Sequence, residues 1–477
     1  MRSTFFGLNI GYKGLAAQQR ALDVTSHNIA NANTPGYTRQ DVIMEPTPAQ
    51  KVLEGYVGTG VTITDFRRIR DSFIDIQMRT ENRALGEWET KDNIIKKLEV
   101  IFNEPSDTSI RSVLDQFWEA WQTLSKNPES VSVRTDVMQR GVTLANTFNH
   151  LDAQFLDLQM DINKEIGLKV NEINTQARQI RDLNIKIMEA ESGGHTANDL
   201  RDKRDMLVEQ LAKNIGIDVV EDELGAVNIL VGGQTLVSRA VLAEIQFNNN
   251  SPLNPTAATL EWYVPADGTY LGQVKLTGGI LKGYVDMRDS VIPAYQAEVS
   301  ELVKAVAEEV NALHRIGFGL DGTTEVDFFT TTDGSLEFNT KNIQVNSLIQ
   351  EDINLIAAAA TDDPEVYAGD NSNALAIAAL KNKLAMNNGV ASFNDFYMAI
   401  IGKLGVQGQE SGQMVANRSY IIEQLMNQRE SVSGVSLDEE MTNMIKYQHA
   451  YSAAARIITA MDQCLETLIF RLGVVGR

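Results

Sequence analysis

The chain has 477 residues, which at a typical size of roughly 150 residues per domain predicts about three structural units. Its 63 acidic side chains outnumber its 42 basic ones, and the formal net charge of -21 disfavours binding to phosphate backbones or anionic lipid. No apolar run approaches the roughly 18 residues that a membrane-spanning helix needs. We therefore expect neither nucleic acid nor a membrane as a partner.

The N-terminal region predicts a helix with one narrow apolar stripe. Leu8, Leu15, Leu22 and Ile29 fall seven positions apart, a repeat typical of a helix that packs along a partner helix. The first twenty residues contain no uninterrupted apolar core and no small-residue cleavage site, so we predict no secretory signal peptide. If the protein leaves the cell, it must do so by another route.

The stretch "SHNIANANTPGYTRQ", residues 26–40, ends this helix. Pro35 disfavours the α conformation at Thr34, and Pro35-Gly36 fits the central positions of a type II turn. We expect the nearby amides to satisfy backbone groups, within one subunit or across to a neighbour. The predicted joint consists of Asn28, Asn31, Asn33, Thr34, Pro35, Gly36 and Tyr37.

Long helices are predicted next, with one β segment among them. Apolar residues seven apart predict a single helix from about 134 to 190, ending at Ser192-Gly193-Gly194. Further helical patterns cover 80–102, 109–126, 197–214, 289–316 and 373–384. Residues 216–286 instead alternate β-branched runs with Gly, Asn and Pro clusters, which is typical of a compact antiparallel β unit.

The most regular helix is predicted at the C-terminal end. It begins after Gly434, with Ser436 as N-cap and Glu439 as its capping-box partner. Its stripe again repeats every seven residues: Leu437, Met444, Tyr451, Ile458, Leu465 and Leu472. An ordinary bundle core could explain two such stripes. Burying one Leu or Ile gains about 1.5 to 3 kcal/mol and ordering one residue costs about 1 to 2, so an isolated two-helix seam barely forms and an assembly interface is favoured.

The predicted fold class is mainly α with a β-rich insertion, in three nested parts. Residues 1–50 with 434–477 form a terminal coiled-coil domain, 51–215 with 287–433 a helical middle domain, and 216–286 a β-rich outer domain.

Motifs for catalysis or cofactor binding are weak. "GFGLDG", residues 317–322, matches a phosphate-loop pattern but follows a helix, so we expect a helix end with Gly317 or Gly319 in the left-handed conformation. The five histidines show no metal-ligand spacing. Cys464, the single cysteine, is expected to be a small buried residue. We predict no enzymatic activity, no metal and no cofactor.

The opening "RSTFFGLNIGYKGLAAQQRALDVTSHNIANANTPGYTRQ" resembles the N-terminal signature of the axial family of bacterial flagellar rod, hook and hook-associated proteins. The internal motifs resemble the hook-associated proteins of the hook-filament junction. They are "DLRDKRDMLVEQLAKNIGIDV" (199–219), "GGILKGYVDMRDSVIPAYQAEVSELVKAVAEEVNALHRIGFGLDG" (278–322), "GDNSNALAIAAL" (369–380) and "SGVSLDEEMTNMIKYQHAYSAAARIITAMDQCLETLI" (433–469).

This resemblance implies a structural subunit of the junction between hook and filament. The implied partners are further copies in a ring, the hook protein, the second junction protein, and an export chaperone at the C-terminal helix. The implied location is the flagellum outside the cell, reached through type III export without a cleaved signal. The alternatives are the second junction protein itself, a hook or rod subunit, or an adhesin displayed on the flagellum.

Overall fold

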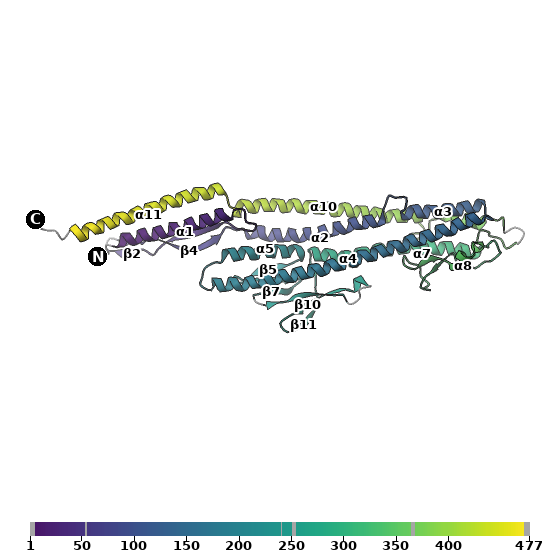
Figure 1. Cartoon of the computed structure of the whole chain (residues 1–477), viewed down its shortest axis with the longest axis horizontal. Helices are drawn as coiled ribbons and strands as arrows, with labels where there is room; N and C mark the ends of the chain where they lie inside the picture. The colour runs from purple at the N-terminus through teal and green to yellow at the C-terminus, as the bar shows by residue number, and fades with distance from the viewer. Residues whose placement is uncertain (1–4, 53–54, 240, 250–253, 364–367, 472–477) are drawn as a thin grey trace.

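The computed structural model describes residues 5–52, 55–239, 241–249, 254–363 and 368–471. Figure 1 shows an elongated molecule with both chain termini at one end, a long helical body, and a group of strands on one side of that body. The fold is mainly α with a β-rich insertion, as predicted.

The terminal unit contains the first and last helices and a small β structure. Helix α1 (Phe6–Asn31) runs antiparallel to α11 (Leu437–Arg471), which starts where the sequence predicts. Strand β1 (Gln40–Pro46) pairs with β4 (Val61–Arg68), and β2 (Gln50–Val52) pairs with β3 (Gly55–Val57). The sequence prediction missed these strands, because their apolar residues are few and interrupted by charged residues and prolines. We use "terminal unit" for α1, β1 to β4 and α11.

The helical body is formed by elements from both sides of the β insertion. From the first half come α2 (Ser72–Phe102), α3 (Ile110–Lys126), α4 (Val131–Glu191) and α5 (Asn198–Asn214). From the second half come α6 (Ile280–Asp286), the π-helical turn η2 (Met287–Val291), α7 (Ile292–Ile316), β12 (Phe329–Thr331), β13 (Ile343–Val345), α8 (Ser347–Glu351), η3 (Ile353–Leu355), α9 (Ser372–Ala379), η4 (Leu380–Asn382) and α10 (Phe393–Ser433). One large apolar cluster joins both halves.

The spacing of apolar residues predicts one long helix of the body and misses another. The predicted long helix at 134–190 is confirmed as α4, 61 residues long. The 41-residue α10 was not predicted. Its sequence contains Gly402, Gly405, Gly408 and Gly412, which interrupt the apolar repeat, and most of its side chains are exposed.

The β unit consists of two antiparallel sheets beside α4. The first has the strand order β5 (Asp218–Glu221), β6 (Val227–Val231), β7 (Gln234–Ser238), β8 (Val241–Leu242). The second has the order β11 (Thr269–Gln273), β10 (Thr259–Val264), β9 (Glu244–Asn248), and the short 3-10 helix η1 (Pro255–Ala257) precedes β10.

Two buried asparagines of α4 hold the β unit on the body. Asn174 donates to the carbonyl of Ile245 at 2.8 Å and accepts from its amide at 2.9 Å. Asn184 makes the same pair of bonds with Val227, at 2.9 and 3.1 Å. The two positions are ten residues apart, close to three helical turns, so both amides leave the same side of α4.

Two local expectations from the sequence are wrong. Helix α7 does end at Ile316, but Gly317 is extended at φ -88°, and Gly319 does not have a positive φ either, so neither glycine is left-handed. Its neighbour Asn373 lies so close that a Cβ at Gly317 would be 2.1 Å from the amide nitrogen, so close packing explains this glycine. Cys464 is exposed and not buried.

His314 gives the body a testable pH dependence. The ring is fully buried, with Nδ1 2.7 Å from the Val326 carbonyl and Nε2 accepting the Ala357 amide at 3.0 Å. Burial lowers the pKa of His314 to about 4, against 6.5 for a free imidazole. The neutral ring is therefore favoured by the folded state, and stability is lost as the pH falls from about 6.5 towards 4, by at most about 3 kcal/mol.

We expect this loss in denaturant unfolding of the wild-type chain measured between pH 7 and 4. The variant His314→Gln lowers stability at pH 7 but lacks the titrating ring, so its curve should be flatter in the same window. Parallel curves for the two proteins would contradict the assignment.

Candidate assembly site: the terminal helix pair and its joint

Small residues on α1 allow α11 to approach closely. The buried residues of α1 are Gly11, Ala17, Ala21, Thr25 and Asn28. A Cβ on Gly11 would lie 2.9 Å from Cγ1 of Ile458, and one on Gly14 would lie 3.8 Å from Cβ of Ala454. The helix axes can approach this closely only because side chains are absent there. A glycine and alanine stripe was the signal in the sequence that the heptad analysis overlooked.

The predicted heptad residues lie beside this seam. Leu8, Leu15, Leu22 and Ile29 of α1 are half-buried. On α11, the half-buried residues of the predicted set are Met444, Tyr451, Ile458 and Leu465. Leu437 is 50% exposed, and Leu472 lies outside the described residues. The pair thus buries its small residues most completely and leaves part of its large apolar surface accessible.

The joint forms the turn that its sequence predicts. The Tyr37 amide donates to the Thr34 carbonyl at 3.1 Å, and Gly36 has φ +78°. These are the features of a type II turn with Pro35 and Gly36 at its centre. The chain therefore leaves α1 and enters β1 through a fixed reversal.

Asn28 uses its whole side-chain amide within this one subunit. Its Oδ1 accepts from the Tyr37 hydroxyl at 2.8 Å and from the Gln40 amide at 3.0 Å. Its Nδ2 donates to the Gln40 carbonyl at 2.9 Å and to Oε2 of Glu440 at 3.1 Å. One buried side chain thereby connects α1, the turn, β1 and α11.

The other two joint asparagines contribute less. Asn31 donates to the His27 carbonyl at 3.0 Å and accepts from the Thr34 hydroxyl at 3.2 Å, so it closes the end of its own helix. Asn33 is exposed, and its amide makes no hydrogen bond to the described part of the chain. Of the three amides, only Asn28 and Asn31 satisfy backbone groups in the folded subunit.

Arg39, which the sequence analysis did not single out, binds the end of α10, the residue after β4 and the first turn of α11. Its amide donates to the Ser433 carbonyl at the end of α10 at 3.0 Å, and its carbonyl accepts from the Ile69 amide at 2.8 Å. Its guanidinium pairs with Glu439 at 2.7 Å and with the buried Glu440 at 2.9 Å. Its sequence gave no signal, because these contacts join residues up to 401 positions apart.

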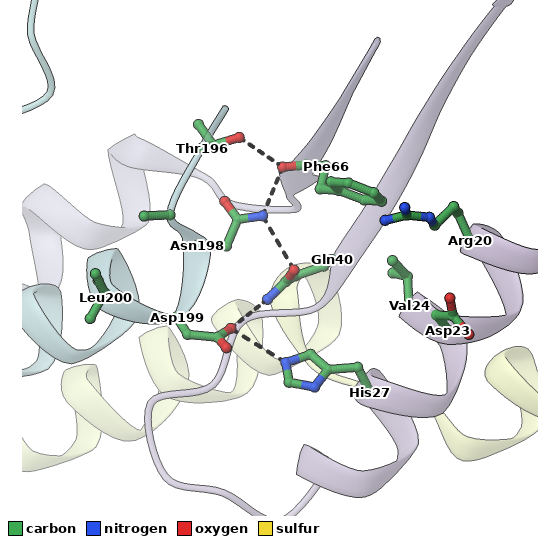
Figure 2. A pocket seen from close by; sticks show the side chains of 11 residues that line it. Arg20, Asp23, Val24, His27, Gln40, Phe66, Thr196, Asn198, Asp199 and Leu200 are labelled. Atoms are coloured by element: carbon green, nitrogen blue, oxygen red, sulfur yellow. Dashed lines mark hydrogen bonds and ion pairs between the residues drawn. The ribbon is translucent and has the colours of Figure 1, made fainter. Parts of the chain in front are cut away.

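The first turns of α5 face the terminal unit with acidic side chains. Figure 2 shows Asp199 between His27 of α1 and Gln40 of β1, with Asn198 reaching towards Gln40 and Phe66. Gln40 donates to Asp199 at 2.8 Å, and His27 lies 3.4 Å from the same oxygen. These side chains line an open pocket of about 480 Å³.

The side chains at the joint hydrogen-bond helices and strands to one another, and their protonation fits this structural role. Burial, followed by the charges of Asp199, Asp202 and Glu440, raises the pKa of Tyr37, so its hydroxyl stays protonated and donates to Asn28. No cluster of three or more potential metal ligands occurs among the described residues. Within that same part of the chain, no helix is long and apolar enough to cross a bilayer.

Comparison with known proteins identifies the class to which this architecture belongs. Residues 95–329 match the family described as "Flagellar hook-associated protein FlgK helical domain". Residues 8–38 match "Flagella basal body rod protein", and residues 426–470 match "Flagellar basal body rod FlgEFG protein C-terminal". The paired terminal helices and the joint therefore coincide with segments shared by flagellar axial proteins.

Full-length relatives narrow the class to one family. Flagellar hook-associated protein 1 of Bacillus subtilis is 33% identical, with all of both chains covered. The proteins of the same name from Salmonella typhimurium and Escherichia coli are 27% and 26% identical, each over 97% of this chain and 99% of the relative. A solved structure, "The structure of the flagellar hook junction protein FlgK from Burkholderia pseudomallei", has the same fold, with a TM-score of 0.66 and 16% identity over 75% of this chain and all of that one. The chain belongs to the flagellar hook-associated protein 1 family.

Replacing Asn28 tests the joint. We expect Asn28→Ala to lower the stability of the terminal unit by about 2 to 4 kcal/mol, because four hydrogen bonds are lost and buried backbone groups at Gln40 are left without partners. Asn33→Ala, at an exposed position of the same turn, should change stability by less than about 0.5 kcal/mol. Thermal unfolding and limited proteolysis of both variants measure the difference; equal effects would contradict the role of Asn28.

A disulfide tests the pairing of the two helices in one subunit. The 3.8 Å separation of the Cβ positions at Gly14 and Ala454 lies within the range of natural disulfides. In a Cys464→Ser background, Gly14→Cys with Ala454→Cys should oxidise to an intrachain bond, seen as faster migration of the non-reduced chain. Exclusive formation of disulfide-linked dimers would show that α1 and α11 pair between subunits instead.

Proposed function

We propose that the chain is a structural subunit of the bacterial flagellum that forms the junction between hook and filament. Two findings support this: a full-length relative named flagellar hook-associated protein 1 at 33% identity, and a terminal helix pair whose apolar surface is incompletely covered. The proposal assigns no catalytic activity, because the family is a structural one.

The exposed apolar stripe on α11 carries the proposal. Leu437, Met441 and Ile445 recur every four residues and are 50%, 56% and 54% exposed. On α1, Tyr12 is 66% exposed beside the half-buried leucines. Because these side chains are already partly covered, covering the rest of each would gain roughly half of the 1.5 to 3 kcal/mol that a fully exposed side chain gains on burial. The terminal helices of neighbouring copies, packed side by side in a ring, would provide that cover.

Such an assembly requires contacts that repeat from one copy to the next. The apolar surface lies on two different helices, α1 and α11, so in the proposed assembly α11 of one copy packs on α1 of the next. Contacts between two different surfaces of neighbouring copies close into rings or continue as helical arrays. We propose the residues Leu8, Leu15, Leu22, Ile29, Leu437, Met444, Tyr451, Ile458, Leu465 and Leu472 as the assembly seam. Of the predicted domain boundaries we keep those at 215 and 433. We move the one at 50 to 69–71, because β1 to β4 belong to the terminal unit, and the one at 286 to 274–279, because α6 belongs to the helical body.

The remaining partners follow from family membership. Above and below the ring, the neighbours would be the second junction protein and the hook protein. Export would proceed through the flagellar type III channel without a cleaved signal peptide, with a chaperone holding α11 before assembly. That helix is a suitable target, because its accessible apolar side chains need cover whenever other copies are absent.

Deletion of the gene tests the junction role itself. Cells without the protein should make hooks but shed filament protein into the medium, because no junction holds the filament. Electron microscopy and analysis of the culture supernatant measure both. Attached filaments of normal length in the deletion strain would refute the proposal.

A double substitution tests the seam separately. Ile458→Asp with Leu465→Asp places two charges on the face of α11 that packs on α1, and a buried unpaired charge costs several kcal/mol. Filament attachment should be lost while circular dichroism still shows a folded helical body. Ser452→Asp with Gln463→Asp adds the same charge to exposed positions of α11 and should leave attachment intact. Normal motility of the first variant would exclude the seam but not the junction role.

A further inference from the structure

Only two short segments connect the terminal unit to the body within the described chain. Residues 69–71 join β4 to α2, and residues 434–436 join α10 to α11. The two segments lie side by side, because Arg39 bonds to Ile69 on one side and to Ser433 on the other. Two adjacent three-residue connections define one axis about which the terminal unit can rotate.

No apolar core extends across this boundary. The large apolar cluster starts at Ile94, and a smaller one between α2 and α10 contains Ile74, Met78, Leu85, Ile422 and Leu425. Among the described residues, neither cluster includes a member of the terminal unit. Domains without a large apolar interface are expected to move relative to one another unless other contacts prevent it.

The contacts across the boundary are polar, and the least exposed ion pairs among them converge on α5. Asp202 accepts from the Thr38 amide at 2.9 Å and from Arg68 at 2.8 Å. Asp205 accepts from Arg68 at 2.8 Å and also pairs with Arg70. The side chains of Arg68 and Asp202 are only 13% and 6% exposed, so water and salt screen their attraction less than that of a surface pair.

Two cavities lie between the terminal unit and the body. The pocket of Figure 2, about 480 Å³, opens between α1 and the start of α5. A second pocket of about 220 Å³ lies between the turn at Pro35 and the end of α10, and is lined by Arg70, Asp205 and Arg429 among others. This open volume at the boundary leaves room for the terminal unit to rotate.

We propose that the boundary between the terminal unit and the body is a hinge locked by charge: the terminal unit rotates about residues 69–71 and 434–436, and the pairs of Arg68 and Arg70 with Asp202 and Asp205 hold one orientation. The aspartates of α5 are positioning residues, since they fix the direction in which the assembly helices leave the body. This property belongs to the single subunit and does not depend on the junction role.

Distance measurement on the full-length monomer tests the lock. Spin labels at Ser452→Cys on α11 and Gln179→Cys on α4, both exposed positions, report the orientation in a Cys464→Ser background. We expect one narrow distance distribution for this protein. Asp202→Asn with Asp205→Asn keeps the shape of both side chains but removes their charge, and should replace the narrow peak by a broad distribution. Arg68→Gln removes the positive charge of the same ion pairs and should also broaden the distance distribution.

A matched control separates the lock from general charge effects. Glu298→Gln with Glu337→Gln removes two carboxylates from ion pairs within the body and should leave the distribution narrow. Unchanged thermal unfolding of the body in every variant shows that the broadening is a motion and not unfolding. A narrow distribution in both Asp202→Asn/Asp205→Asn and Arg68→Gln, or a broad one in the parent protein, would overturn the proposal. Neither result would affect the filament-shedding test of the junction role.

Discussion

The fold depends on the pairing of its first helix with its last. Gly11 and Ile458 are in contact although they are 447 positions apart in the sequence, and the contact requires that the chain leave α1 and enter α11 at the same end of the body. Everything between them must therefore form a closed path: out along α2 and α3, back along α4 to α5 and the β unit, out again along α7, and back along α10. Because the path is closed, the terminal unit contains the first and last parts of the sequence, the body lies inside these parts, and the β unit is innermost.

Asparagine side chains join a helix to a strand at several points of this path. An amide offers donor and acceptor groups, as a peptide does, so it can bond to both backbone groups of a strand residue on the side that faces away from the neighbouring strand. Asn28 does this at the joint, and Asn174 and Asn184 do it where the β unit meets α4. Asn311 of α7 likewise donates to the Phe329 carbonyl and accepts from its amide, which fixes β12 on the body. Helices and strands are thus connected by specific bonds as well as by apolar packing.

The features that could be predicted from the sequence are those determined by residues close together in the chain. The heptads of α4, the N-cap of α11 and the type II turn at Pro35 each follow from residues close together in the chain. The missed features depend on distant residues: the partners of Arg39 and Asp202 become adjacent only after folding, and α10 owes its stability to neighbours that tolerate its glycines. The seam of α1 was misjudged for a different reason. Large apolar residues dominate a periodicity analysis, whereas the closest helix contact is made where side chains are smallest.

The length of α4 has a mechanical consequence. At a rise of 1.5 Å per residue, its 61 residues form a rod about 90 Å long. A body of that length acts as a lever on the short connections at its end. A rotation of about 5° at the connections 69–71 and 434–436 would move the far end of such a rod by about 8 Å, more than the pitch of one helical turn. Subunits of one sequence could then take up appreciable differences in the geometry of their neighbours while every internal contact of the body stays the same.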